Sequence, residues 1–183
     1  MTGQLRDKVA IVTGASNGIG RAIAETFAAE GAKTVLAARR AELLDEVVAG
    51  IEGKGGTALP VPADLTSEEQ IAALFDHAVK VYGRLDLLVN NAGMSTTKNT
   101  EDITLQFWRD ALALNITASF LCSRAAIRIM KAQTPQGGRI INIGSISQKT
   151  PRPDSLAYAV CKHGLQGMTH QLTMDGRKYG VVA

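Results

Sequence analysis

Short apolar runs alternate with helix-like segments along the whole chain, and this alternation most limits the possible fold. The apolar runs lie at 8–13, 34–38, 58–63, 85–89, 139–143 and 181–183. Segments with helical patterning lie between them, at 21–30, 41–51, 66–82, 106–131 and 155–179. Continuous apolar strands are typical of a parallel sheet that helices cover on both faces. We therefore predict an α/β fold with a doubly wound parallel sheet in three layers.

The composition of two apolar runs indicates where the sheet ends. Pro60 and Pro62 lack amide hydrogens, so the run 58–63 is expected at an edge of the sheet. The run 181–183 is too short to anchor a parallel strand well, so we expect an incomplete last strand and a C-terminal truncation. No linker, short repeat or low-complexity segment interrupts the pattern, which predicts one domain over 1–183.

Composition and charge exclude several classes of protein. Hydrophobic residues make up 45% and charged residues 20% of the 183 residues, as in soluble globular proteins. The net charge of +3 comes from scattered residues, so no nucleic-acid partner is expected. Cys122 and Cys161 lack metal-ligand spacing, which predicts free thiols and no metal site. The polar N-terminal segment 1–8 and the lack of a long apolar run predict a cytoplasmic protein without a membrane segment.

A glycine-rich segment, TGASNGIG at 13–20, joins the first expected strand to the first helix. Gly14, Gly18 and Gly20 permit a tight turn and let the backbone approach a phosphate. The following helix presents unpaired N–H groups to a pyrophosphate. This arrangement predicts a dinucleotide site, and a glycine-rich turn without a ligand is the alternative.

Arg39 and Arg40 follow the second expected strand, where sites that prefer NAD carry an acidic residue. After this strand, the first residue with a carboxylate side chain is Glu42. Because a guanidinium binds phosphate in a bidentate manner, the pair favours the 2′-phosphate of NADP, and NAD is less expected. The alternative is a solvated pair at a helix start, with Glu42 neutralising one of its members.

Polar groups with possible chemical roles follow the fourth and fifth strands. Asn90-Asn91-Ala92-Gly93 occupies a position that borders the ligand crevice of such sheets, but the same residues are common in turns. Ser145 lies just beyond the fifth strand and can donate to a substrate oxygen. Tyr158 and Lys162 share one helix face, so the ammonium should lower the phenol pKa towards the range useful for proton transfer.

Four of these features, in this order, resemble the motifs of the short-chain dehydrogenase/reductase family, which has a Rossmann-type sheet. They are TGASNGIG at 13–20, NNAG at 90–93, Ser145 and YxxxK at 158–162. The N-terminal half is most similar to the 3-oxoacyl-[acyl-carrier-protein] reductase branch. The resemblance implies that Tyr158 is the general acid and that Ser145 holds the substrate oxygen. It also implies that Lys162 tunes Tyr158 and binds the nicotinamide ribose, and that Asn115 keeps a water for a proton relay.

The family also suggests the cofactor contacts, to which the arginine pair is added. The expected contacts are Gly14, Ser16, Asn17, Gly18, Ile19, Gly20, Arg39, Arg40, Asp64, Leu65, Asn91, Ala92, Gly93, Tyr158 and Lys162.

The function expected from this resemblance is an NADP-preferring oxidoreductase for a carbonyl/alcohol pair, with a 3-oxoacyl thioester among the open substrates. Family members continue beyond the sixth strand into a substrate-covering region that this chain lacks. The alternative is therefore an inactive, truncated fragment that binds nucleotide or dimerises, and a nucleotide-binding regulator is a third class. Apolar residues outside the catalytic face, including Leu165, Met168 and Leu172, predict a homodimer or homotetramer.

Overall fold

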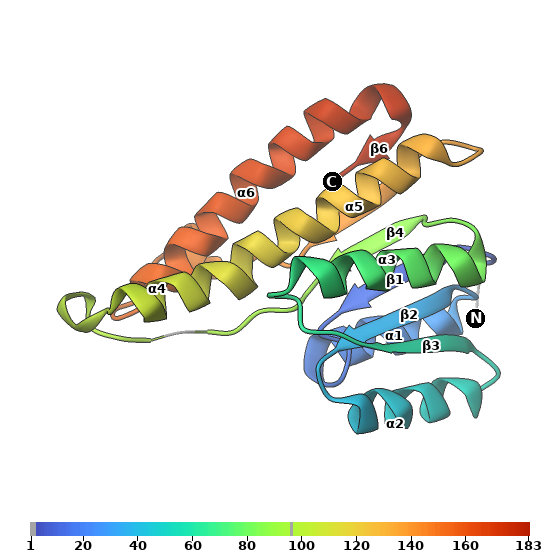
Figure 1. Cartoon of the computed structure of the whole chain (residues 1–183), viewed down its shortest axis with the longest axis horizontal. Helices are drawn as coiled ribbons and strands as arrows, with labels where there is room; N and C mark the ends of the chain where they lie inside the picture. The colour runs from blue at the N-terminus through green and yellow to red at the C-terminus, as the bar shows by residue number, and fades with distance from the viewer. Residues whose placement is uncertain (1–2, 96) are drawn as a thin grey trace.

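The computed structural model describes residues 3–95 and 97–183, so Met1 and Thr2 of the polar N-terminal segment lie outside the described residues (Figure 1). The strands are β1 (Val9–Thr13), β2 (Lys33–Ala38), β3 (Thr57–Pro62), β4 (Leu87–Asn90), β5 (Gly138–Asn142) and β6 (Val181–Val182). They form one parallel sheet in the order β3-β2-β1-β4-β5-β6. The predicted doubly wound parallel sheet is confirmed, and β3 lies at the edge that its prolines indicated.

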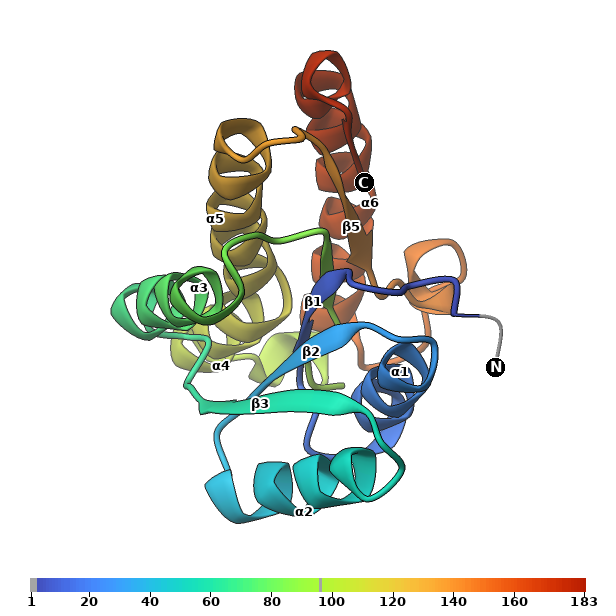
Figure 2. The ribbon, with the colours of Figure 1, turned by 90° about the vertical axis from the view of Figure 1, so that its right-hand side faces the viewer.

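Helices cover both faces of this sheet, as Figure 2 shows. They are α1 (Gly18–Ala29), α2 (Ala41–Glu52), α3 (Glu68–Tyr82), α4 (Leu105–Leu112), α5 (Ala118–Ala132) and α6 (Leu156–Gly176). Neighbouring strand residues point to opposite faces. Val12 of β1 therefore packs with Ala24 of α1 and Leu44 of α2, whereas Ile11 packs with Leu74 of α3 and Ala126 of α5. The two buried clusters explain why the strands are apolar throughout.

The long helical stretch predicted over 106–131 is confirmed as a helix over Leu105–Ala132, but it is not a regular α-helix throughout. A five-residue π-helical segment, Ala113–Thr117, separates α4 from α5. Within it, Asn115 Nδ2 donates to the carbonyl of Ala111 at 2.9 Å, so a side chain supplies a bond where the regular ladder is interrupted. No glycine or proline marks the break, which is why the apolar pattern reads as a single helix.

The stretch Leu105–Ala132 is long and apolar enough to cross a membrane by length and composition alone, with a mean hydropathy of 1.3 in its best window. A core helix of a soluble protein passes the same test. Here α5 turns Cys122, Ala126 and Met130 into the sheet, and all three are buried. Only 39% of the window is buried within this chain, so the opposite face of the helix remains uncovered.

Helix α6 lies beside α5 in both views (Figures 1 and 2). The exposed face of α6 differs from the prediction, because Leu165 is only 2% exposed and is buried within this chain. On α5 and α6 the exposed large apolar side chains are instead Phe120 of α5 and Leu156, Val160 and Met174 of α6. The helical segment predicted over 155–179 ends its α-helical part at Gly176 and continues as a 3-10 turn.

Candidate cofactor and active site

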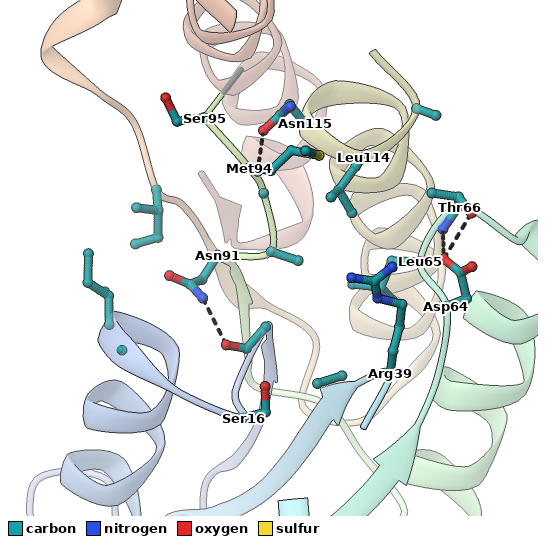
Figure 3. A pocket seen from close by; sticks show the side chains of 18 of the residues that line it. Ser16, Arg39, Asp64, Leu65, Thr66, Asn91, Met94, Ser95, Leu114 and Asn115 are labelled. Carbon is teal, nitrogen blue, oxygen red and sulfur yellow. Dashed lines mark hydrogen bonds between the residues drawn. The ribbon is translucent and has the colours of Figure 1, made fainter. Parts of the chain in front are cut away.

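A cleft of about 680 Å³ opens along the carboxyl ends of β1, β2, β4 and β5 (Figure 3). It brings together Asn115 and every expected cofactor contact except Gly20, including Tyr158 and Lys162. Ser145 is not among its lining residues, although its neighbour Gly144 is. Met94, Ser95, Thr66 and Asp110 also line the cleft and were not expected from the sequence.

The glycine-rich loop after β1 forms one wall of this cleft. Gly14 has a φ of +65°, a conformation that favours glycine. Gly20 lies behind the loop, where a Cβ would come within 2.3 Å of the Gly14 carbonyl oxygen and 2.5 Å of Asn91 Nδ2. Gly20 thus shapes the wall without lining the cleft. At the start of α1, the Asn17 side chain makes no capping hydrogen bond, so it leaves the helix N–H groups available to an anion.

Thr13 is a positioning residue that the sequence analysis missed. Its hydroxyl donates to the Val89 carbonyl at 3.0 Å and accepts from the amides of Asn91 at 3.0 Å and Ala92 at 3.1 Å. Asn91 Nδ2 donates back to the Thr13 carbonyl at 3.0 Å. These bonds join the loops after β1 and β4. Their partners lie 76 to 79 residues apart in the sequence, so local pattern could not reveal them.

The end of the cleft beside β2 contains two arginines, Arg39 and Arg40, and the carboxylate of Asp64. Arg39 and Arg40 line it at the end of β2, and within the described residues neither forms a salt bridge. Asp64 accepts from Thr66 through both its amide at 2.9 Å and its hydroxyl at 2.8 Å. These hydrogen bonds, with a smaller contribution from Arg39, lower the pKa of Asp64. Figure 3 shows Arg39 beside Leu65 and Asp64.

Asn115 connects the π-helical segment to the loop after β4. Its Oδ1 accepts from the Met94 amide at 2.9 Å, and its side chain is 1% exposed (Figure 3). A Cβ on Gly93 would lie 2.8 Å from this oxygen, so glycine is required for the close approach. The break in the helix therefore aims Asn115 at the floor of the cleft.

Tyr158 and Lys162 lie on the first turns of α6, as their spacing predicts. The Lys162 ammonium is 5.6 Å from the centre of the Tyr158 ring. Lys162 is buried and donates to the Ile143 carbonyl at 2.7 Å, at the end of β5. Burial lowers the pKa of Lys162, with the neighbouring Cys161 acting in the opposite direction. This arrangement places a cation between the phenol and the carboxyl end of the central sheet.

Ser145 follows β5 and begins a 3-10 turn, Ile146–Gln148. Its hydroxyl oxygen accepts from the Ser147 amide at 3.1 Å. The Gln148 side chain folds back towards the Ser145 amide, completing a reciprocal cap that the sequence analysis did not recognise. The pattern Ser-x-x-Gln at 145–148 was a readable signal for it.

Cys122 and Cys161 are buried free thiols. Burial raises the pKa of Cys122 to about 12, and burial also raises that of Cys161. In the described part of the chain, no group of three or more His, Cys, Asp or Glu side chains could hold a metal ion.

Comparison with known proteins decides the family. The family model for short chain dehydrogenases matches residues 8–183. The chain belongs to the short-chain dehydrogenase family. A solved metagenomic short-chain oxidoreductase in complex with NADP superposes with a TM-score of 0.92 at 38% identity, over 97% of this chain and 80% of that protein.

Short-chain dehydrogenases with different named activities resemble this chain to similar extents. A 3beta-hydroxysteroid dehydrogenase of Mediterraneibacter gnavus is 34% identical over 98% of this chain. A 3-oxoacyl-[acyl-carrier-protein] reductase of Synechocystis sp. is 36% identical over 97% of it. The chain spans 64% of the length of the first and 71% of the second. The resemblance to the reductase branch is present, but these identities do not single it out.

Proposed function

We propose that this short-chain dehydrogenase is an NADP-preferring oxidoreductase for a carbonyl/alcohol pair. The observation that carries the proposal is the single cleft that holds the glycine-rich loop, the Arg39–Arg40 pair and the Tyr158–Lys162 pair. A phosphate cradle, a site for a further phosphate and a proton donor with a neighbouring cation are the groups that such a reaction needs.

The residues of the cleft fit a nicotinamide dinucleotide. The close approach of Gly14 and Gly20, which a Cβ would prevent, leaves a backbone cradle at the start of α1 for the pyrophosphate. Arg39 and Arg40 would bind the 2′-phosphate, while Asp64 and Leu65 would flank the adenine. The bound nicotinamide would supply the hydride, and the protein would supply its orientation.

Each polar residue near the nicotinamide end has a proposed task. Tyr158 protonates the carbonyl oxygen, and Ser145 donates a hydrogen bond to the same oxygen. Lys162, whose ammonium lies 5.6 Å from the centre of the Tyr158 ring, would bind the nicotinamide ribose. Asn115 fixes the Met94 loop through its side chain and helps to hold a water that relays protons to Lys162.

We further propose that residues 1–183 act as one dinucleotide-binding unit within a cytoplasmic homo-oligomer. The uncovered apolar faces of α5 and α6 support assembly. A 3-oxoacyl thioester is the first substrate to test, because a relative of this chain is named for that activity.

The test of the reaction is Tyr158→Phe, with NADPH oxidation measured over a panel of carbonyl substrates. The ring still packs while the proton donor is lost, so kcat should fall about 10²–10⁴-fold and NADPH affinity should change little. An unchanged kcat in this variant of an active protein would reject Tyr158 as the acid.

The test of the cofactor is Arg39→Ala with Arg40→Ala, measured by NADPH and NADH fluorescence titration. Loss of charge-assisted phosphate contacts, each about 1.5–3 kcal/mol, should weaken NADPH much more than NADH. Glu42→Gln, which changes a neighbouring charge on α2, is the control. Equal affinities of the unmutated protein for the two cofactors would contradict the preference.

A second candidate is a fragment that binds nucleotide or dimerises without turnover. The chain spans 64% of the length of the steroid dehydrogenase that it resembles. NADPH binding without NADPH oxidation, over the whole substrate panel, would support it over the enzyme.

A further inference from the structure

The loop after β5 contains a hydrogen-bonded turn that begins at Ser145. Ser145 is extended, with φ −156° and ψ 153°, and the chain then enters the 3-10 turn Ile146–Gln148. The Gln148 amide donates to the Ser145 carbonyl at 3.1 Å, which closes the turn. Ser147 is fully buried, so the turn is anchored in the protein, where it packs against α6.

Within this turn the Ser145 hydroxyl has one fixed hydrogen bond. Its oxygen accepts from the Ser147 amide at 3.1 Å. A serine hydroxyl has one donor and two acceptor positions. Because the backbone N–H occupies an acceptor position, the hydroxyl proton is not used by the turn. That proton remains available to a substrate oxygen that approaches the Ser145 hydroxyl.

Gln148 lies over the other side of the same serine. Its Oε1 is 3.5 Å from the Ser145 amide, a long contact, and reaches over Gly144. A Cβ on Gly144 would lie 2.7 Å from Oε1, so the folded-back side chain depends on glycine at that position. Two residues before Ser145, the Ile143 carbonyl is held by Lys162. Ser145 is therefore constrained on both sides, by Lys162 before it and by Gln148 after it.

We propose that Gln148 is a positioning residue, which holds Ser145 in the conformation that leaves its hydroxyl proton for the substrate oxygen. The proposal rests on the proposed carbonyl/alcohol chemistry and deepens it. Gln148 would not touch the reacting atoms and would act through Ser145 alone. A residue that only closed the turn would affect stability, whereas a positioning residue should also affect kcat in a manner that depends on Ser145.

The first arm of the test measures amide exchange by NMR on the 183-residue chain, and it does not depend on turnover. Gln148→Leu keeps the volume but removes the acceptor, so the Ser147 amide should exchange roughly fivefold faster as its bond to Ser145 loosens. Gln148→Glu retains the acceptor and should keep the exchange slow. Ser145→Ala removes the partner and gives the fully released rate. An unchanged Ser147 rate in Gln148→Leu overturns the proposal.

Gln171→Leu is the matched control for this arm. It makes the same chemical change on the exposed face of α6, where the Gln171 side chain donates to Asp175 at 2.8 Å. It should leave the Ser147 exchange rate unchanged. A similar acceleration in this control would mean that the effect is not specific to Gln148.

The second arm is a double-mutant cycle on kcat for NADPH-dependent carbonyl reduction. Ser145→Ala should lower kcat about 10²-fold, and Gln148→Leu about tenfold with KM for NADPH unchanged. Gln148→Glu should restore most of the loss. In the Ser145→Ala background Gln148→Leu should have no further effect, because Gln148 acts through that hydroxyl. Independent, multiplying effects overturn the proposal.

The two arms separate the inference from the function on which it rests. A normal kcat in Ser145→Ala rejects the proposed role of Ser145, and with it any catalytic consequence of Gln148. If no substrate is turned over, the proposed function fails, and the exchange rate of Ser147 alone decides whether Gln148 holds Ser145.

Discussion

Replacing Gly20 by alanine should damage the cofactor wall, and the size of the effect follows from two short distances. The new Cβ would lie 2.3 Å from the Gly14 carbonyl oxygen and 2.5 Å from Asn91 Nδ2. Neither atom can move freely, because Asn91 Nδ2 donates to the Thr13 carbonyl at 3.0 Å and to the Gly14 carbonyl itself at 3.3 Å. Forcing a methyl into such a site costs about 1–3 kcal/mol and sometimes more. Alanine would return about 1 kcal/mol in helix propensity, since Gly20 lies within α1.

The steric cost less the helix gain leaves about 1 kcal/mol, so we expect Gly20→Ala to lower the free energy of unfolding by that amount, which for a chain of this size is roughly 2–4 °C in Tm. NADPH affinity should also fall, because the displaced Gly14 carbonyl belongs to the loop that lines the cleft. Urea denaturation and NADPH fluorescence titration measure the two effects.

Gly18→Ala is the control for this variant. Gly18 has a φ of +55°, but nothing lies within 4 Å of its Cβ position. Its penalty comes from backbone conformation alone, about 1–2 kcal/mol. The reasoning is refuted if Gly20→Ala is as stable as the unmutated chain and binds NADPH equally well.

Three further predictions concern stability and assembly. Asp86 accepts from the Val9 amide at 3.0 Å and from Arg84 at 2.7 Å, and these bonds lower its pKa despite the opposing effect of burial. Asp86→Asn should therefore cost about 2 kcal/mol of unfolding free energy in urea at pH 7, and this difference should shrink as the pH falls below the ordinary carboxyl pKa of 3.8. In the described ranges, the Ser147 hydroxyl oxygen is the one buried side-chain polar atom without a hydrogen-bond partner. Ser147→Ala removes it, so the Tm measured by calorimetry should stay equal or rise. A fall of several degrees would show that this hydroxyl has a partner. Val160→Glu, on the uncovered face of α6, should convert a light-scattering dimer or tetramer to monomer, and an unchanged assembly would locate the interface elsewhere.

The parts of the fold that could be predicted from the sequence are those that depend on local chemistry. Apolar runs predict strands buried on both faces, and Pro60 and Pro62 predict an edge. Ser67, a residue type that often caps helices, precedes α3, and its hydroxyl accepts from the Gln70 amide at 3.2 Å. Gly83 then ends this helix with a φ of +76°.

The parts that could not be predicted depend on contacts between distant residues. Thr13 bonds to the loop after β4, and Asn115 bonds to Met94, 21 residues away. The prediction that Leu165 lies on an exposed face of α6 was also wrong. Several faces of this helix are apolar, and only the packing of the folded chain decides which of them is covered. Most cleft residues were nevertheless identified, since parallel strands bring their carboxyl ends to one edge.

The π-helical segment Ala113–Thr117 has a consequence for how this chain tolerates changes in length. A π turn holds one residue more than an α turn, so deleting a residue there would allow one regular helix to run from Leu105 onward. Such a deletion would rotate α5 by about 100° relative to α4. The buried row of Cys122, Ala126 and Met130 would then turn away from the sheet, or Asn115 would turn away from the cleft. The additional residue lets α5 bury its row against the sheet while Asn115 faces the cleft. Substitutions in this segment should therefore be far better tolerated than deletions.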